Sequence, residues 1–550
     1  MIRYMLLTLC LLLCHMSIAQ ISINGAKVFH DRRTNTFLAS IPQGQWGKEC
    51  FVSVIQTDSC LWQNVMVDGQ GINHPVRLDL SAPHKIYLVT ATIGDSLIAA
   101  HLEFTYLPII HLEGEFGYDD APGIVTLQQP DGSMEAMTAL VRWRGATTNQ
   151  EFKHKRNYRI KFVDGDGEKQ NRRLFSLRND DDWILDAGQA DMFRLRNHIA
   201  AELWNDFATK PYYAGKNSDI YTATRGEVVE VFLNDEYRGI YNLCEPMDRK
   251  QLKLKEYDSA TGEIHGGLWK SVGWSFTTFE EQPPLYDNTQ PEWCDYELKY
   301  PKTDDLCPSD YSTLYNAIDF VVNATGEEFK EHVGEYIDLP VFYDYILFMN
   351  VLDAFDLAGK NLYWAVYDKQ QSKRITPVMW DLDSTVGQSF AHEPPPHPEY
   401  VSYDSWPMLP TKISIQLFDN DYDCFSSFLA KRYFSLRKDV FSFSSLFERY
   451  KSHYDLIKGC GAVQREERLW SGDTDIEGLK LDFEAELSFI RNWLDNRLKH
   501  LDIFFSDPAS VRGLLRNVPI NGRTYTIQGT PALPAQKGIV VSEGKKMLHR

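Results

Sequence analysis

The sequence predicts an α+β protein made of several units, and three observations support this. Residues 20–106 contain short apolar segments separated by Gly, Asn, Asp and Pro turns. The middle of the chain mixes hairpin patterns with helical ones, and from residue 413 to about 505 the apolar residues recur at helical spacing. With 550 residues, of which 43% are hydrophobic, the chain is long enough for two or three domains and is not disordered overall.

Residues 1–19 have the pattern of a secretory signal peptide. Arg3 precedes the apolar run MLLTLCLLLC, and SIA supplies the small residues of a cleavage site. Cys14 leaves lipid attachment open as an alternative. No later segment is apolar enough to span a bilayer, so the sequence predicts an exported protein without a transmembrane segment: periplasmic, at the outer surface or secreted.

Residues 20–106 are expected to form a small β-sandwich of immunoglobulin type. Segments such as CFVSVIQ, VRLDL and KIYLVTATI recur at regular spacing without a helical period. A spacer or docking role would suit such a unit.

The charge balance argues against nucleic acid as a partner. The chain has 57 basic and 76 acidic residues, a net charge of −19, and no long basic stripe. A protein this acidic must concentrate its few cations locally if it binds a polyphosphate.

Seven cysteines remain after the signal peptide, since 2 of the 9 lie within it. In an oxidising compartment sequence neighbours could pair, although spacing does not determine connectivity. The neighbouring pairs are Cys50 with Cys60, Cys294 with Cys307, and Cys424 with Cys460.

Residues 107–506 are expected to form the main domain, which begins with strands. In RNYRIKF, Ile160 and Phe162 share one face while Arg159 and Lys161 share the other. Lys161 could therefore reach into a cleft, or it could be a solvated lysine protecting a strand edge.

A helix and a hairpin follow. LRNHIAAELW has helical spacing and carries Asn197 near its start, and VVEVFL and YRGIYNLCE flank a turn at Asn234-Asp235. Glu245 ends the second strand, where a carboxylate could orient a lysine of a neighbouring strand or simply lie on the surface.

The segment 353–388 carries the polar cluster around which the main domain is organised. An apolar helix at 339–352 should deliver Asp356, and NLYWAVYD and RITPVMW read as a hairpin that brings Asn361 close to Asp381 and Asp383. Oxygen ligands of this kind suit Mg²⁺ or Mn²⁺. The same spacing also fits an Asp that caps a turn, an Asn in a left-handed turn and a strand that ends in WDLD.

The ordered motifs of the main domain resemble the spore-coat protein H (CotH) family of atypical, secreted protein kinases. The resemblance runs from about residue 107 to 505 and rests on six blocks: RGATT, NYRIKF, LRNHIAAELW, VEVFLNDEYRGIYNLCEPMDR, DLAGKNLYW and VMWDLDSTVG. It implies a kinase-like core with a C-terminal helical lobe, which binds ATP with a divalent metal and phosphorylates Ser or Thr of exported proteins.

The resemblance also implies roles for single residues. Asp356 would be the base for the acceptor hydroxyl, Asp381 the principal metal ligand with Asp383 as its neighbour, and Asn361 a second metal ligand.

For the nucleotide, the resemblance implies that Lys161 grips the phosphates with support from Glu245. Arg144 and Thr147 would lie near the phosphates.

The chain departs from ordinary protein kinases, since it has no GxGxxG loop, no His-Arg-Asp triplet, and WDLD in place of Asp-Phe-Gly. RGATT also differs from the RGNSS-like turn usual in the family. Rival cations for the lysine role are Lys155, Arg159 and Lys270.

The sequence predicts a small β tail at residues 507–550. KGIVV and GKKMLHR resemble the sorting tails of proteins exported by the type IX system, and a terminal β-hairpin is the alternative.

Two functions follow from the sequence. The first is an exported protein kinase with a nucleotide and an exported protein as partners. The second is a non-catalytic kinase-like surface module that binds protein or glycan ligands, with aromatic segments such as SYDSWP as stacking surfaces.

Overall fold

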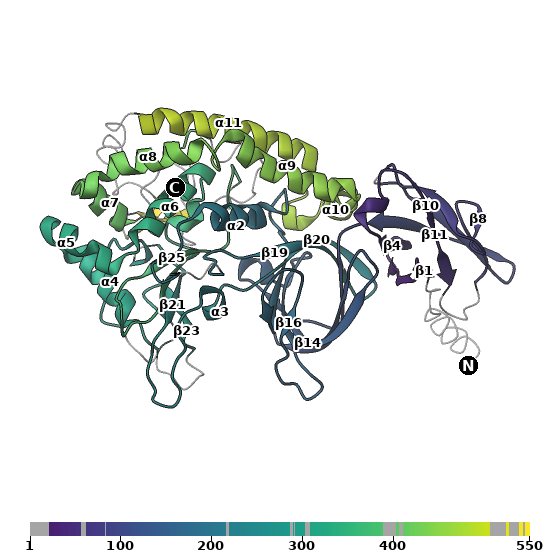
Figure 1. Cartoon of the computed structure of the whole chain (residues 1–550), viewed down its shortest axis with the longest axis horizontal. Coiled ribbons are helices and arrows are strands. Elements are labelled where there is room, and N and C mark those ends of the chain that lie inside the picture. Colours follow the sequence, from purple (N-terminus) through teal and green to yellow (C-terminus); the bar gives the residue numbers. More distant parts are fainter. Residues whose placement is uncertain are drawn as a thin grey trace.

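The computed structural model confirms the α+β class and is shown in Figure 1. It describes residues 21–56, 62–82, 84–215, 219–274, 276–286, 290, 292–302, 309–388, 403–405, 411–506, 524–526, 538–542 and 545–549. The predicted signal peptide lies outside these residues.

The N-terminal unit is built from strands around its own core. Its largest sheet has the order β3-β4-β11-β10-β7-β8, with β4 and β11 parallel. The immunoglobulin-type assignment stays a prediction. The strands are β1 (Ile21–Ile23), β2 (Ala26–Lys27), β3 (Phe29–Asp31), β4 (Thr36–Ser40), β5 (Glu49–Val52), β6 (Val54–Gln56), β7 (Gln63–Val67), β8 (Gln70–Gly71), β9 (Val76–Asp79), β10 (Tyr87–Ile93) and β11 (Ser96–Thr105).

The main domain begins with a closed seven-stranded barrel of order β12-β13-β14-β15-β18-β20-β19. Apolar side chains fill its interior, among them Ile160 and Phe162, while Arg159 and Lys161 lie on the outer face as the alternation predicts. The strands are β12 (Ile109–Glu113), β13 (Ala121–Gln128), β14 (Met134–Arg144), β15 (Asn157–Phe162), β18 (Asp182–Asp186), β19 (Gly226–Leu233) and β20 (Glu236–Cys244).

A second sheet, of order β22-β23-β21-β24-β25, lies beside the barrel (Figure 1). Its strands are β21 (Gly267–Ser271), β22 (Glu292–Trp293), β23 (Tyr296–Tyr300), β24 (Leu362–Val366) and β25 (Thr376–Met379). A two-stranded ribbon, β16 (Arg172–Arg173) with β17 (Asn179–Asp180), adjoins the barrel, and the tail strands β26 (Thr524–Thr526), β27 (Gly538–Ser542) and β28 (Lys545–His549) form a small sheet of their own.

Several helices lie along the top of the main domain in Figure 1, and residues 411–506 are largely helical, as the sequence predicts for 413 to about 505. The α-helices of the described residues are α2 (Arg196–Phe207), α3 (Arg249–Leu252), α4 (Ser312–Asn323), α5 (Gly326–Tyr336), α6 (Leu339–Leu352), α7 (Lys412–Asp419), α8 (Phe425–Arg437), α9 (Phe443–Gly459), α10 (Ala462–Trp470) and α11 (Phe483–Ser506). No helix in the described residues is long and apolar enough to cross a membrane.

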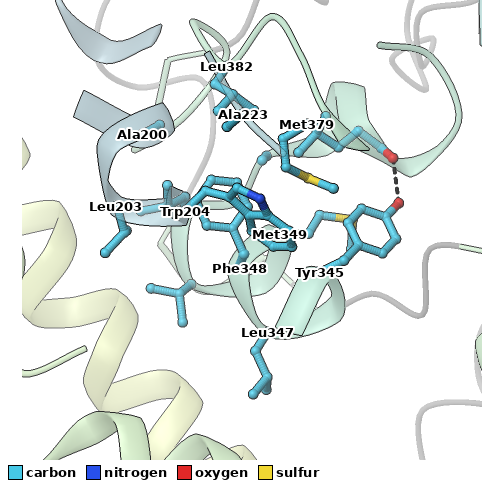
Figure 2. Packing of buried hydrophobic residues seen from close by; sticks show 14 of the residues in the cluster. Ala200, Leu203, Trp204, Ala223, Tyr345, Leu347, Phe348, Met349, Met379 and Leu382 are labelled. Atoms are coloured by element: carbon cyan, nitrogen blue, oxygen red, sulfur yellow. Dashed lines mark hydrogen bonds between the residues drawn. The ribbon is translucent and has the colours of Figure 1, made fainter. Parts of the chain in front are cut away.

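Helix α6 is buried on all sides and anchors the polar segment that follows it. Figure 2 shows Trp204 of α2 against Phe348 of α6, with ring centroids 5.3 Å apart. Met379 and Leu382 lie in the same cluster, one on each side of Trp380 and Asp381 in the sequence. The end of β25 is therefore held on a packed apolar base.

A buried ionic network joins the barrel to the helical lobe. Glu466 of α10 accepts hydrogen bonds from Lys155 Nζ at 2.6 Å and Arg194 Nε at 2.8 Å, and its other oxygen accepts from the Ile240 amide at 2.8 Å. All three charged side chains are at most 2% exposed. Burial lowers the pKa of Lys155 to about 7, and Glu466 opposes that shift.

We expect Glu466→Gln to lower the free energy of unfolding by about 3–5 kcal/mol, because it leaves two cations buried with no anion beside them. Chemical denaturation would measure the change. Glu484→Gln is the matched control: Glu484 is 78% exposed and pairs with Lys458 at 3.4 Å, so its loss should cost about 1 kcal/mol or less. Equal losses in both variants would contradict the prediction.

The described cysteines do not form the predicted Cys424–Cys460 bridge. Both are free thiols; Cys460 is buried and Cys424 exposed. The buried Cys460 sulfur instead hydrogen-bonds the Ile457 carbonyl, as the turn after α9 places it inside the core. Cys60 and Cys307, the partners in the other two candidate pairs, lie outside the described residues.

Candidate active site

The β24–β25 hairpin brings the two polar segments together as the sequence predicts. Leu362 pairs with Met379, so Asn361 and Asp381 lie just beyond the same end of the hairpin. Both residues adopt left-handed backbone conformations, with φ of 60° and 62°. Asn and Asp tolerate this region better than most residues, which fits their place at these turns.

Asp356 lies in a short 3-10 turn, Phe355–Ala358, that follows α6. The Tyr345 hydroxyl of α6 donates a hydrogen bond to the Leu357 carbonyl, which is drawn in Figure 2 and ties this turn to the core helix. Burial raises the pKa of Asp356 to about 6; Lys360 opposes the shift and Asp381 adds to it. A carboxylate of this kind is poised to accept a proton near neutral pH.

Asp186 is a further carboxylate that the fold places near Asp381 and Asp383, and no sequence motif predicts it. Asp186 ends β18 of the barrel and accepts hydrogen bonds from the Asn197 side chain at 2.8 Å and the Gly188 amide at 3.1 Å. Asn197 also accepts from the Leu382 amide at 3.0 Å, so one side chain of α2 links the barrel to the WDLD segment. The only sequence signal was an Asp directly after the apolar strand WIL.

Asp381 and Asp383 are half-buried and strongly influenced by neighbouring carboxylates. Burial raises the pKa of Asp381; Lys270 opposes the shift and Asp186 adds to it. Burial raises the pKa of Asp383 well above its usual range, and Asp381, Asp186 and Asp356 raise it further. Within the described residues, neither carboxylate accepts a hydrogen bond or has a cation within 4 Å.

Cations gather next to this carboxylate group. Lys270 of β21 pairs in register with Tyr363 of β24, and burial lowers the pKa of Lys270 while Asp381 opposes the shift. The Arg144 guanidinium lies 5.2 Å from the centre of the Trp380 ring, which stacks on Tyr363 at 5.8 Å. Lys270, Arg144 and Lys360 are thus the cations whose charge favours the ionised form of Asp381.

Lys161 and Glu245 do not pair with each other, contrary to the expectation from the sequence. Lys161 Nζ lies 2.5 Å from Asp120 on the outer face of the barrel, because its strand alternation points it away from the interior. Glu245 is buried and accepts from the Arg178 amide at 2.6 Å and from Arg225 at 3.3 Å. The side chain of Thr147 lies outside the described residues.

Two of the alternative candidates for the phosphate-binding cation form ion pairs away from Asp381. Lys155 belongs to the buried network of Glu466, and Arg159 forms a two-point ion pair with Asp182. Of the four candidates, Lys270 is the one whose pKa responds to Asp381.

The carboxylates fit a hard divalent cation in chemistry and in charge. Asp381, Asp383 and Asn361 offer oxygen ligands, and the carboxylates of Asp186, Asp356, Asp381 and Asp383 repel one another in the bare protein. The arrangement is open. In the described residues, two groups of three His, Cys, Asp or Glu side chains have ligand atoms within 4.8 Å of one another, and neither group includes these carboxylates. Water and phosphate oxygens commonly complete the shell of Mg²⁺.

Comparison with known protein families gives a match over most of the main domain. Residues 141–501, which make up more than half of the chain, match the family described as CotH kinase protein. A search of curated proteins found no match. The matched range contains the barrel strands from β15 onward, the β24–β25 hairpin and nearly all of the helical lobe, and with it Asp186, Asp356 and Asp381. The chain therefore belongs to the CotH kinase family.

Proposed function

We propose that this protein is an exported, metal-dependent protein kinase that transfers the γ-phosphate of ATP to Ser or Thr of other exported proteins. The observation that carries the proposal is the electrostatic influence of Lys270 and Arg144 on Asp381, within a group of half-buried carboxylates; among the described residues, Asp381 and Asp383 have no cation within 4 Å. Phosphoryl transfer needs charge neutralisation and positioning more than covalent chemistry from the protein.

The site residues would have three roles: binding the metal, binding the phosphates and positioning the WDLD segment. Asp381, Asp383 and Asn361 would hold Mg²⁺ or Mn²⁺, which supplies charge neutralisation on the phosphate oxygens when it is bound. Lys270 of the second sheet and Arg144 at the end of barrel strand β14 would hold the phosphates. Asn197, oriented by its hydrogen bond to Asp186, would fix the WDLD segment in place through the Leu382 amide.

Asp356 would accept the proton of the acceptor hydroxyl. Its pKa of about 6 leaves it mainly ionised at neutral pH, and a nearby cation would lower that pKa further. The buried 3-10 turn restricts its movement and keeps it close to Asp381.

The proposal can be tested with purified mature protein, labelled ATP, and Mg²⁺ or Mn²⁺, offered to a dephosphorylated mixture of exported proteins. We expect transfer that EDTA abolishes and that Asp356→Ala abolishes without loss of the ATP-dependent thermal shift. The shift separates the two roles, because Asp356 acts on the acceptor and not on the nucleotide.

Failure to transfer phosphate, together with no thermal shift on addition of ATP and metal, would contradict the proposal. Glycan or protein binding that persists in Asp381→Ala would then support the non-catalytic module. An ATP-dependent shift without transfer would mean that the acceptor was missing from the mixture, and autophosphorylation at high protein concentration would decide that case.

A further inference from the structure

A second set of metal-binding side chains lies outside the kinase site, where α2 crosses α9. His198 and Glu202 are four residues apart on one face of α2, and His453 faces them from α9. His198 Nε2 is 3.3 Å from Glu202 Oε1, and His453 Nε2 is 2.7 Å from Glu202 Oε2. The two imidazole rings meet edge to face with centroids 5.0 Å apart.

These three side chains suit a different metal from the kinase site. Imidazole nitrogen with one carboxylate is a donor set for Zn²⁺ and related ions, whereas Mg²⁺ prefers oxygen alone. Tetrahedral zinc with ligand bonds of about 2.0–2.1 Å places its ligand atoms roughly 3.3 Å from one another. The two histidines approach different oxygens of Glu202, and one ligand atom from each of the three residues lies within 4.8 Å of the others, so small side-chain movements would bring the three onto one ion.

Burial holds the two imidazole rings of this group in place. His198 is 5% exposed on its side chain, His453 15% and Glu202 40%, so the rings are held firmly while one side of the group stays open to solvent.

The other set of potential ligands is weaker. His154 is exposed, and the Asp475 carboxylate already accepts hydrogen bonds from the amides of His154 and Lys155, both at 2.8 Å. Both amides bind Oδ2 of Asp475 and leave its buried Oδ1 without a hydrogen-bond partner among the described residues, so this group offers one free carboxylate oxygen but an exposed imidazole that already pairs with Asp473.

We propose that His198, Glu202 and His453 form a structural zinc site that fastens α2 to α9. Zinc would replace the two imidazole–carboxylate hydrogen bonds, with the fourth position open to water. Because His198 directly follows Asn197, the site would fix the helical turn that holds Asp186 and the Leu382 amide. Its existence does not depend on the kinase activity, since metal content can be measured without any phosphate transfer.

The test is zinc content of the full chain after chelation, reloading with one equivalent of Zn²⁺ and desalting. We expect about one zinc ion per chain in the wild type and in the control His332→Gln, in which an exposed His that pairs with Glu335 at 2.9 Å is changed. We expect loss of the ion in His453→Gln and in Glu202→Gln. His453 and Glu202 are partly exposed, so these variants should fold, and circular dichroism would verify this.

Cobalt provides a second readout. Co²⁺ in place of zinc should give the visible absorption of a tetrahedral site in the wild type and in His332→Gln but not in His453→Gln. Zinc should also raise the melting temperature of the wild type and leave that of His453→Gln unchanged.

Wild-type protein that retains no zinc after desalting would overturn the proposal. Retention in His453→Gln combined with loss in His154→Gln would also overturn it, because the ion would then belong to the group of Asp473 and Asp475.

Discussion

Asp381→Asn is expected to abolish phosphate transfer and, at the same time, to stabilise the metal-free protein at neutral pH. Transfer should fall on the order of 10³-fold or more, because the variant loses the proposed principal metal ligand and the charge that holds the cation. The free energy of unfolding without metal should rise by about 1–3 kcal/mol at pH 8, since one member of a mutually repelling carboxylate group becomes neutral.

The pH dependence follows from the direction of the pKa shifts. Burial raises the pKa of both Asp381 and Asp383 in the folded protein, so their protonated forms are favoured by folding. Their contribution to stability is therefore fully present below about pH 4 and is lost as the pH rises through the folded-state values. The stability difference between Asp381→Asn and the wild type should be largest at pH 8 and should vanish towards pH 4.

Thermal denaturation between pH 4 and 8, with and without Mn²⁺, would measure both effects. Mn²⁺ should stabilise the wild type and leave Asp381→Asn unchanged. Asp495→Asn is the control, as Asp495 is an exposed residue of α11 that pairs with Lys499 at 2.6 Å. A variant that loses activity and also loses stability at pH 8 would indicate a structural role for Asp381 instead of a metal-binding one.

Lys270→Met is expected to lower kcat/KM for ATP by about 10²–10³-fold, whereas Lys161→Met should change it by less than about threefold. Lys270 is the lysine whose charge most lowers the pKa of Asp381, and Lys161 is neutralised by Asp120 on the outer face of the barrel. Methionine preserves most of the length and apolar volume of the lysine stem, so the comparison isolates the charge.

Steady-state kinetics with varied ATP would separate the two lysines, and Lys499→Met would control for the loss of a surface charge. A large loss in Lys161→Met with little change in Lys270→Met would restore the assignment that the family resemblance implies. It would also require the Lys161–Asp120 pair to open when nucleotide binds.

The sequence correctly predicts structure that depends on local patterns. The alternation in RNYRIKF, the turn at Asn234-Asp235 and the hairpin between Asn361 and Asp381 all depend on neighbours within about twenty residues, and all three are present. Turn chemistry and side-chain alternation are encoded locally, so a single sequence carries them.

Partners that come from distant parts of the chain could not be predicted in this way. Asp186 reaches the site through Asn197 and the Leu382 amide, a contact that spans 185 positions. Lys270 and Lys161 both looked suitable as cations, and only the pairing of β21 with β24 separates them. The pairing of His453 with Glu202 spans 251 positions and left no pattern in the sequence.

The sequence by itself determined the α+β class, the helical segment from 413 to about 505, and the residue types that the proposed phosphate site requires. The tertiary structure alone decided which of those residues meet. Barrel closure sends Lys161 outward to Asp120 and brings Asp186 to the WDLD segment, because strand order and register set which faces come together, and these depend on packing across the whole chain.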